Sequence, residues 1–128
     1  MLYEVLYELG YKRSSNVASG RSGTYFPFLV IKDDEEKEIM EYPLSISDAE
    51  YDESDLDSNI ISDKWYEVLE KNSKNRTPTV LLVHPTPKRG KIEMVREFLE
   101  KIKKEGYWIV DFKTFSDFWE KQGVIGNR

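Results

Sequence analysis

The sequence has no cysteine and a single histidine, His84. Without cysteine the chain forms no disulfide, offers no thiolate to a metal ion and has no cysteine nucleophile. These absences exclude the class of small disulfide-rich secreted proteins. With only one histidine, the chain by itself cannot build a zinc site that needs several histidine ligands.

Positive charge and long hydrophobic runs are also scarce. The chain has 19 Lys and Arg against 24 Asp and Glu, a net charge of −5. Nucleic acids and anionic membranes are bound by basic surfaces, so we expect neither as a partner. No apolar run approaches the length of a membrane span, and residues 1–10 are too short and too acidic for a signal peptide. We therefore expect a cytoplasmic protein, whose 128 residues fit a single domain.

The sequence is organised around residues 77–87, Thr-Pro-Thr-Val-Leu-Leu-Val-His-Pro-Thr-Pro. Its apolar run predicts a strand over 79–84, buried on both faces, which stops near His84 because the prolines that follow donate no ladder hydrogen bonds. In α/β folds the carboxyl ends of strands carry the reactive groups, so His84 is a candidate catalytic residue. The alternative is a strand-end histidine that is hydrogen-bonded only to backbone.

Apolar spacing predicts the remaining elements. Apolar residues at helical spacing predict four helices, at 2–9, 92–105 and 115–122 and from residue 60 to the segment 72–78, which ends that helix. Glycines at 10 and 106 end the first and third of these along the chain. Extended stretches are predicted at 26–31, 39–46 and 107–112, with a brief one in 11–17. The order strand, helix, strand, helix at the end of the chain predicts an α/β fold of mostly parallel strands that alternate with helices.

Three further features bear on function. Arg21 lies in the glycine-containing loop 19–23, where it is suited to clamp a carboxylate or a main-chain carbonyl, or else is a solvated loop arginine. The strand at 39–46 leads into Asp48 and then into the acidic tract 50–57, which is typical of a solvated loop. Thr114 and Asp117, three residues later, resemble a capping box at the start of the last helix. We expect the aromatic residues of that helix, Phe115, Phe118 and Trp119, to face inward.

Several stretches, taken in order, resemble the carboxyl-terminal half of a polysaccharide deacetylase-like domain. They are Leu-Tyr-Glu-Leu-Gly-Tyr-Lys-Arg-Ser-Ser (6–15), Gly-Arg-Ser-Gly-Thr-Tyr-Phe-Pro-Phe (20–28), Met-Glu-Tyr-Pro-Leu-Ser-Ile-Ser-Asp (40–48) and Leu-Leu-Val-His-Pro (81–85), followed by the closing helix, strand and helix. The resemblance covers nearly the whole chain. It implies a partial (β/α) barrel and a metal-dependent hydrolase that removes acetyl groups from N- or O-acetylated sugars.

The resemblance also implies roles for particular residues. His84 matches the family's late strand-end histidine, the catalytic acid that protonates the leaving amine or alcohol. Asp48 resembles a late acidic catalytic position, and Arg21 a substrate-binding arginine of the pocket. The family's general base and its metal ligands lie in an amino-terminal half that this sequence does not contain. We therefore expect no metal-binding residues in this chain, although zinc or another divalent metal belongs to the complete family domain.

Two function classes stay open. The first is a carbohydrate deacetylase that acts on an acetylated saccharide once a missing half is supplied. The second is a non-catalytic relic of that fold, or a domain that binds carbohydrate or protein. Trp65, Trp108 and Trp119 could stack on sugars, but their helix and strand positions favour core packing. Half a barrel leaves strand edges and apolar faces uncovered, so we expect a homo-oligomer or docking of an amino-terminal half-domain.

Overall fold

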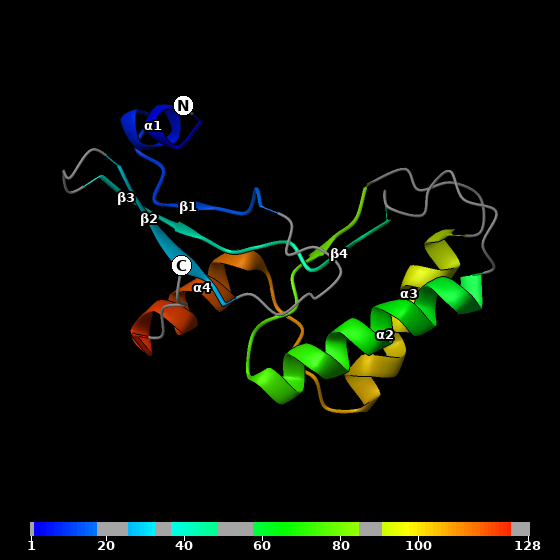
Figure 1. The fold of residues 1–128 in the computed structure, drawn as a ribbon. Helices are drawn as coiled ribbons and strands as arrows, with labels where there is room; N and C mark the ends of the chain where they lie inside the picture. Colours follow the sequence, from blue (N-terminus) through cyan, green and yellow to red (C-terminus); the bar gives the residue numbers. More distant parts are fainter. Residues whose placement is uncertain (1, 18–25, 33–36, 49–57, 85–90, 124–128) are drawn as a thin grey trace. The chain divides into compact units, whose positions relative to one another are not determined.

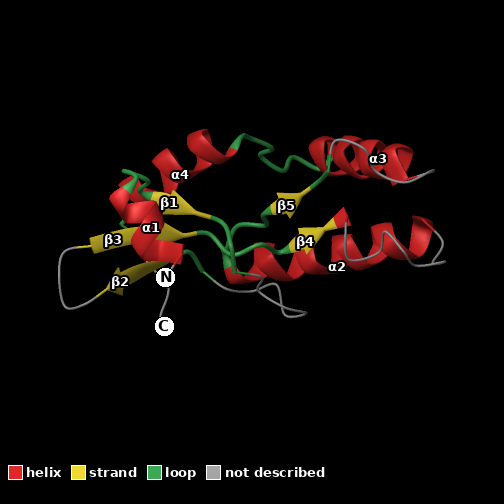
Figure 2. Cartoon of the chain, turned by 90° about the horizontal axis from the view of Figure 1, so that it is seen from above, coloured by secondary structure: helices red, strands yellow, loops and turns green. Residues whose placement is uncertain are grey.

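The computed structural model describes residues 2–17, 26–32, 37–48, 58–84 and 91–123. This part of the chain contains four helices and five short strands, so the expected mixed α/β class is confirmed (Figures 1 and 2). None of the helices in it has the length and apolar character that a bilayer span requires. In chain order the elements are α1 (Leu2–Glu8), β1 (Arg13–Ser14), β2 (Phe28–Lys32), β3 (Lys37–Glu41), β4 (Ile46–Ser47), α2 (Ser58–Asn75), β5 (Leu81–Leu82), α3 (Lys91–Lys104) and α4 (Phe112–Lys121).

The chain divides into two compact units. The first is built from the described residues within 1–46 and 68–81, and the second from those within 47–67 and 82–124. Helix α2 contributes its last turns to the first unit and its first turns to the second.

The first unit contains a three-stranded sheet in the order β1–β3–β2, which contacts α1 through β3 (Figure 1). β1 pairs with β3 in parallel, with Arg13 opposite Met40, while β2 and β3 are antiparallel. The expectation of mostly parallel strands is therefore wrong for this sheet. The reason is the connection: only four residues separate β2 from β3, whereas a parallel crossover needs a dozen or more.

Glu41, at the end of β3, holds the first unit together. Its fully buried carboxylate accepts hydrogen bonds from the Tyr3 hydroxyl at 2.9 Å and from the backbone N–H groups of Asn16 and Val17 at 2.8 and 3.2 Å. Burial, the hydrogen bond to Glu41 and the negative charge of that residue raise the pKa of Tyr3 to about 12. Helix α1 and the segment after β1 are thereby tied to the same side chain.

The core of the second unit lies between the first turns of α2 and helix α3. Trp65 packs edge-on against Phe98, with ring centroids 5.4 Å apart, and both side chains are buried. The predicted helix at 92–105 is confirmed within one residue at each end, and Gly106 follows it with a φ of 91°, a left-handed conformation that suits glycine. Ile92, predicted on the inner face of α3, is exposed because it lies in the first turn, at the edge of the contact.

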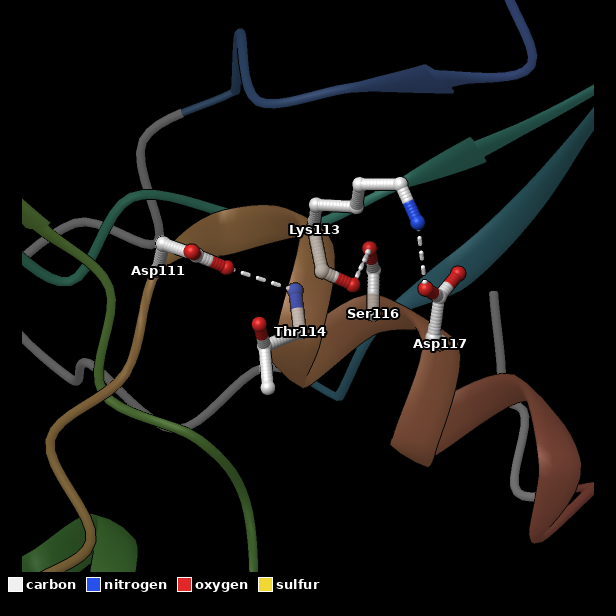
Figure 3. Close-up of polar contacts among 5 residues, drawn as sticks. All are labelled: Asp111, Lys113, Thr114, Ser116 and Asp117. Atoms are coloured by element: carbon white, nitrogen blue, oxygen red, sulfur yellow. Dashed lines mark hydrogen bonds and ion pairs between the residues drawn. The ribbon is translucent and has the colours of Figure 1, made fainter.

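The predicted strand at 107–112 is wrong. Residues 107–110 form no strand, and helix α4 already begins at Phe112 (Figure 3). Asp111 is the N-cap: its Oδ1 accepts a hydrogen bond from the Thr114 N–H at 2.7 Å. Thr114 is therefore inside the helix and does not open a capping box. Hydrogen bonds from Thr114 lower the pKa of Asp111, which keeps the capping carboxylate ionised.

Candidate functional site

The strand that leads to His84 is shorter than the sequence predicts. The predicted strand over 79–84 is observed only at Leu81–Leu82, and it pairs with β4 in a two-stranded sheet (Figure 2). Leu82 and Val83 are exposed rather than buried on both faces, because a sheet of two short strands covers little of either face. The expected buried central strand is therefore wrong. His84 nevertheless lies two residues beyond the carboxyl end of β5.

Asp48 lies one residue beyond the carboxyl end of β4, and the structure brings it to His84. Its Oδ1 is 2.6 Å from the His84 Nδ1, and its Oδ2 accepts a hydrogen bond from the His84 backbone N–H at 2.7 Å. Ile46 is hydrogen-bonded to Val80, and Asp48, two residues later, is hydrogen-bonded to His84, four residues later. The residue numbers rise together along both segments, so β4 and β5 run parallel. Parallel strands place their carboxyl ends at one edge, which explains why the two side chains meet.

The two members of the pair differ in exposure. The Asp48 side chain is 6% exposed and the His84 side chain 52%. A buried carboxylate needs donors to compensate for the loss of water, and both of its oxygens have one in His84. The imidazole, by contrast, is bound at Nδ1 and keeps about half of its surface in solvent. The interpretation of His84 as a histidine bonded only to backbone is wrong, because its ring binds a side-chain carboxylate.

This geometry determines what the imidazole can do. An ionised carboxylate only accepts hydrogen bonds, so the Nδ1 of His84 carries the proton that faces Asp48. The other ring nitrogen, Nε2, then has a lone pair when the ring is neutral and a proton when the ring is charged. A histidine oriented in this way can transfer a proton in either direction at Nε2, while the carboxylate of Asp48 fixes the ring at Nδ1.

Polar contacts in the first unit fix the two strands upstream of the pair. The Ser45 Oγ accepts a hydrogen bond from the Val80 N–H at 3.0 Å, and the Val80 carbonyl accepts one from the Ser45 N–H at 2.9 Å. The buried Asn72 of α2 donates to the Thr79 hydroxyl at 2.8 Å and to the Ser45 hydroxyl at 3.4 Å. These bonds set the register between the segments that end in Asp48 and His84.

The remaining expected site features lie elsewhere or are not found. Arg21 and the acidic tract 50–57 lie outside the described residues. Within the described ranges, no three side chains of His, Asp or Glu converge as metal ligands would, and the Asp48–His84 pair supplies two. No chemical step is assigned to a metal ion held by these residues.

Sequence reasoning missed the position of Trp108. Its side chain is 58% exposed, whereas Trp65 and Trp119 lie in the core as expected. Phe118, predicted to face inward, is also exposed. The available signal was Asp111, whose preference for helix N-caps leaves too few residues before it for a buried strand.

Comparisons of the chain with models of protein families, with curated proteins and with solved structures give no significant match.

Proposed function

We propose that this chain is a carbohydrate deacetylase-like protein, built on part of a (β/α) barrel, in which His84 is the general acid and Asp48 orients it. The observation that carries the proposal is the Asp48–His84 pair, with both residues just beyond the carboxyl ends of adjacent parallel strands. A half-exposed imidazole held at Nδ1 by a buried carboxylate has its Nε2 available to a bound substrate. The likeness of the surrounding segments to polysaccharide deacetylases supplies the substrate class, an acetylated saccharide.

The proposed role of His84 belongs to the second half of the reaction. After water has added to the acetyl carbonyl, the tetrahedral intermediate must expel the sugar amine or alcohol. The Nε2 proton of the charged imidazole passes to that leaving nitrogen or oxygen as its bond to the carbonyl carbon breaks. The products are acetate and the free amine or alcohol, and the imidazole is left neutral. Asp48 supports this step by holding the ring at Nδ1, so that the proton is delivered from Nε2.

Activation of the attacking water is not assigned to residues of this chain. In the family that the sequence resembles, a divalent metal ion supplies this activation, and its ligands precede the segments matched here. Our proposal therefore includes a second stretch of polypeptide that carries the metal site. We expect no appreciable acetate release from this chain alone, because metal activation of water supplies much of the rate of such hydrolases.

Complementation tests the proposal. The purified chain is mixed with the metal-binding half-domain of a polysaccharide deacetylase, and acetate release from N-acetylchitohexaose is measured with and without zinc. The wild-type chain should restore metal-dependent release, and His84→Ala should lower it by about 10²- to 10⁴-fold. Asp63→Asn, a substitution on the exposed face of α2, is the matched control and should leave the rate unchanged.

Two outcomes would contradict the proposal. Metal-dependent release by the chain alone, lost in His84→Ala, would mean that the second stretch of polypeptide is not needed. Saccharide binding without any release after complementation would favour the non-catalytic binding domain instead.

A further inference from the structure

An exposed aromatic surface lies on the second unit, around the segment that leads into α4. We define the Trp108 surface as the side chains of Trp108, Phe115 and Phe118. Trp108 is 58% exposed and Phe118 45%, whereas the other two tryptophans of the chain are 1% and 8% exposed. A tryptophan with more than half of its surface in water is unusual, because its large apolar ring gains most from burial. The exposure of Trp108 is therefore consistent with a role in binding.

The three rings of the Trp108 surface pack against one another. Trp108 and Phe118 meet edge to face, with centroids 5.2 Å apart and an interplanar angle of 77°. Phe115 lies 6.3 Å from Trp108 and 6.4 Å from Phe118, and it also contacts the buried ring of Trp119 at 5.6 Å. The exposed rings are therefore connected to the core through Phe115. Such a surface is already arranged before a ligand arrives, so little side-chain entropy is lost on binding.

Polar side chains share the helix face with Phe118. Thr114 lies four residues before it, Lys121 three after and Gln122 four after, and these spacings bring side chains together on an α-helix. All three are exposed. They provide a hydroxyl, an ammonium and an amide, which between them donate to and accept from hydroxyl groups. An aromatic ring beside donors and acceptors of this kind matches a sugar, which has an apolar C–H face and a rim of hydroxyls.

The area of the surface argues against a protein partner. An aromatic side chain carries about 150–250 Å² of surface, so the exposed parts of Trp108, Phe118 and their exposed neighbours Ile109 and Phe112 amount to roughly 400 Å². A specific protein interface needs about 800 Å² on each partner. A single pyranose ring, in contrast, needs only one aromatic face.

We infer that the Trp108 surface is a carbohydrate subsite, on which a pyranose ring of an oligosaccharide stacks against the indole of Trp108. The inference rests on the proposed function for the substrate class. It adds that the ligand is an oligosaccharide rather than a single sugar, and that one of its rings is held by stacking at a site separate in sequence from the pair Asp48 and His84.

Fluorescence of the intact chain tests the subsite. Only Trp108 among the three tryptophans is exposed, so acrylamide quenching reports mainly on it. N-acetylchitohexaose should protect Trp108 from quenching, and N-acetylglucosamine should do so far less. By calorimetry, Trp108→Ala should weaken hexaose binding about tenfold, and Trp108→Phe should weaken it less because a ring remains. Leu9→Ala, at an exposed apolar residue just after α1 in the first unit, is the matched control and should leave binding unchanged.

The NMR signals of the His84 ring, recorded in the same titration, separate this inference from the proposed function. If the His84 ring responds to the hexaose while Trp108 is not protected, or if Trp108→Ala binds as well as wild type, the subsite is wrong and the proposed function stands. If Trp108 is protected and His84 does not respond, the subsite stands and the role of His84 is wrong. Protection of Trp108 that grows with protein concentration in the absence of sugar would identify a second copy of the chain as the occupant and would overturn the subsite.

Discussion

Asp48 binds His84 twice: one carboxylate oxygen contacts the ring Nδ1 at 2.6 Å and the other accepts the backbone N–H at 2.7 Å. The two residues are 36 positions apart in the sequence. The backbone bond places the histidine and the ring bond orients it. Because Nδ1 is occupied by Asp48, Nε2 is the ring nitrogen that would meet a ligand.

Replacing Asp48 by Asn should change which nitrogen of His84 carries the proton. An amide can donate to Nδ1, so the neutral ring would shift toward the form that is protonated at Nε2. The free energy of unfolding should fall by about 1–3 kcal/mol, because a buried acceptor of two hydrogen bonds is altered. Two-dimensional ¹H–¹⁵N spectra of the ring, which is unique in this chain, measure the change. Asp63→Asn is the control, and an unchanged ring spectrum in Asp48→Asn would contradict the assigned pairing.

Replacing Asn72 by Ala should loosen the register between β4 and β5. The buried Asn72 amide bonds to Ser45 and Thr79, and its loss leaves these groups without that partner. We expect a loss of about 1–3 kcal/mol in the free energy of unfolding and broadened ring signals of His84. Asn75→Ala, at the exposed end of α2, should cost less than about 0.5 kcal/mol. Equal stability of the two variants in urea titrations would show that Asn72 does not set the register.

Tyr3 should ionise at a higher pH than an ordinary tyrosine. Its pKa is about 12 in the folded chain against an ordinary value of 10.0, so the folded state keeps a proton that the unfolded state loses. Stability from this group is complete below pH 10 and is lost as the pH rises to 12. Absorbance at the phenolate band should contain a component near pH 12 that is absent in Tyr3→Phe. The component should remain in Tyr11→Phe, and its persistence in Tyr3→Phe would contradict the contact with Glu41.

The apolar stripe of α1 and the residue that follows it should support association of the chain. Leu2, Val5 and Leu9 are exposed, with Leu9 at 69%, as expected for a fold that needs a partner for its uncovered faces. Sedimentation at micromolar concentration should detect species larger than a monomer, and Leu9→Glu should reduce them. Ile60→Glu, a comparable change at an exposed apolar residue of α2, should have no effect. A wild-type chain that stays monomeric would contradict the expected self-association.

Local sequence patterns predicted the helices better than the strands. The stripe that ends at Gly10 and the α3 stripe that ends at Gly106 carry their own signals, because helix periodicity and a glycine after the last turn are local. The apolar run around Trp108 was ambiguous, since four such residues suit a strand or a linker equally well. Asp111 resolves that ambiguity in the structure by capping α4, and Trp108 is left exposed.

The contact between Asp48 and His84 could not be predicted from local patterns. It depends on the pairing of β4 with β5, and two strands of two residues carry no information about their mutual register. The resemblance to deacetylases implied a catalytic role for each of the two residues, and the structure places them in contact. The role of the buried Glu41 also escaped prediction, because its partners lie on α1 and after β1, far away in the sequence.

The central claim is that the Nε2 of His84 faces an acetylated sugar, and NMR of the His84 ring in the intact chain tests it most directly. The chain is titrated with N-acetylchitohexaose, with an O-acetylated xylohexaose and with the fully deacetylated form of each. The account predicts saturable shifts of the ring signals with at least one acetylated ligand, and much weaker shifts with its deacetylated form. Ring signals that stay unchanged up to millimolar concentrations of both acetylated ligands, or that respond equally to the deacetylated forms, would contradict it.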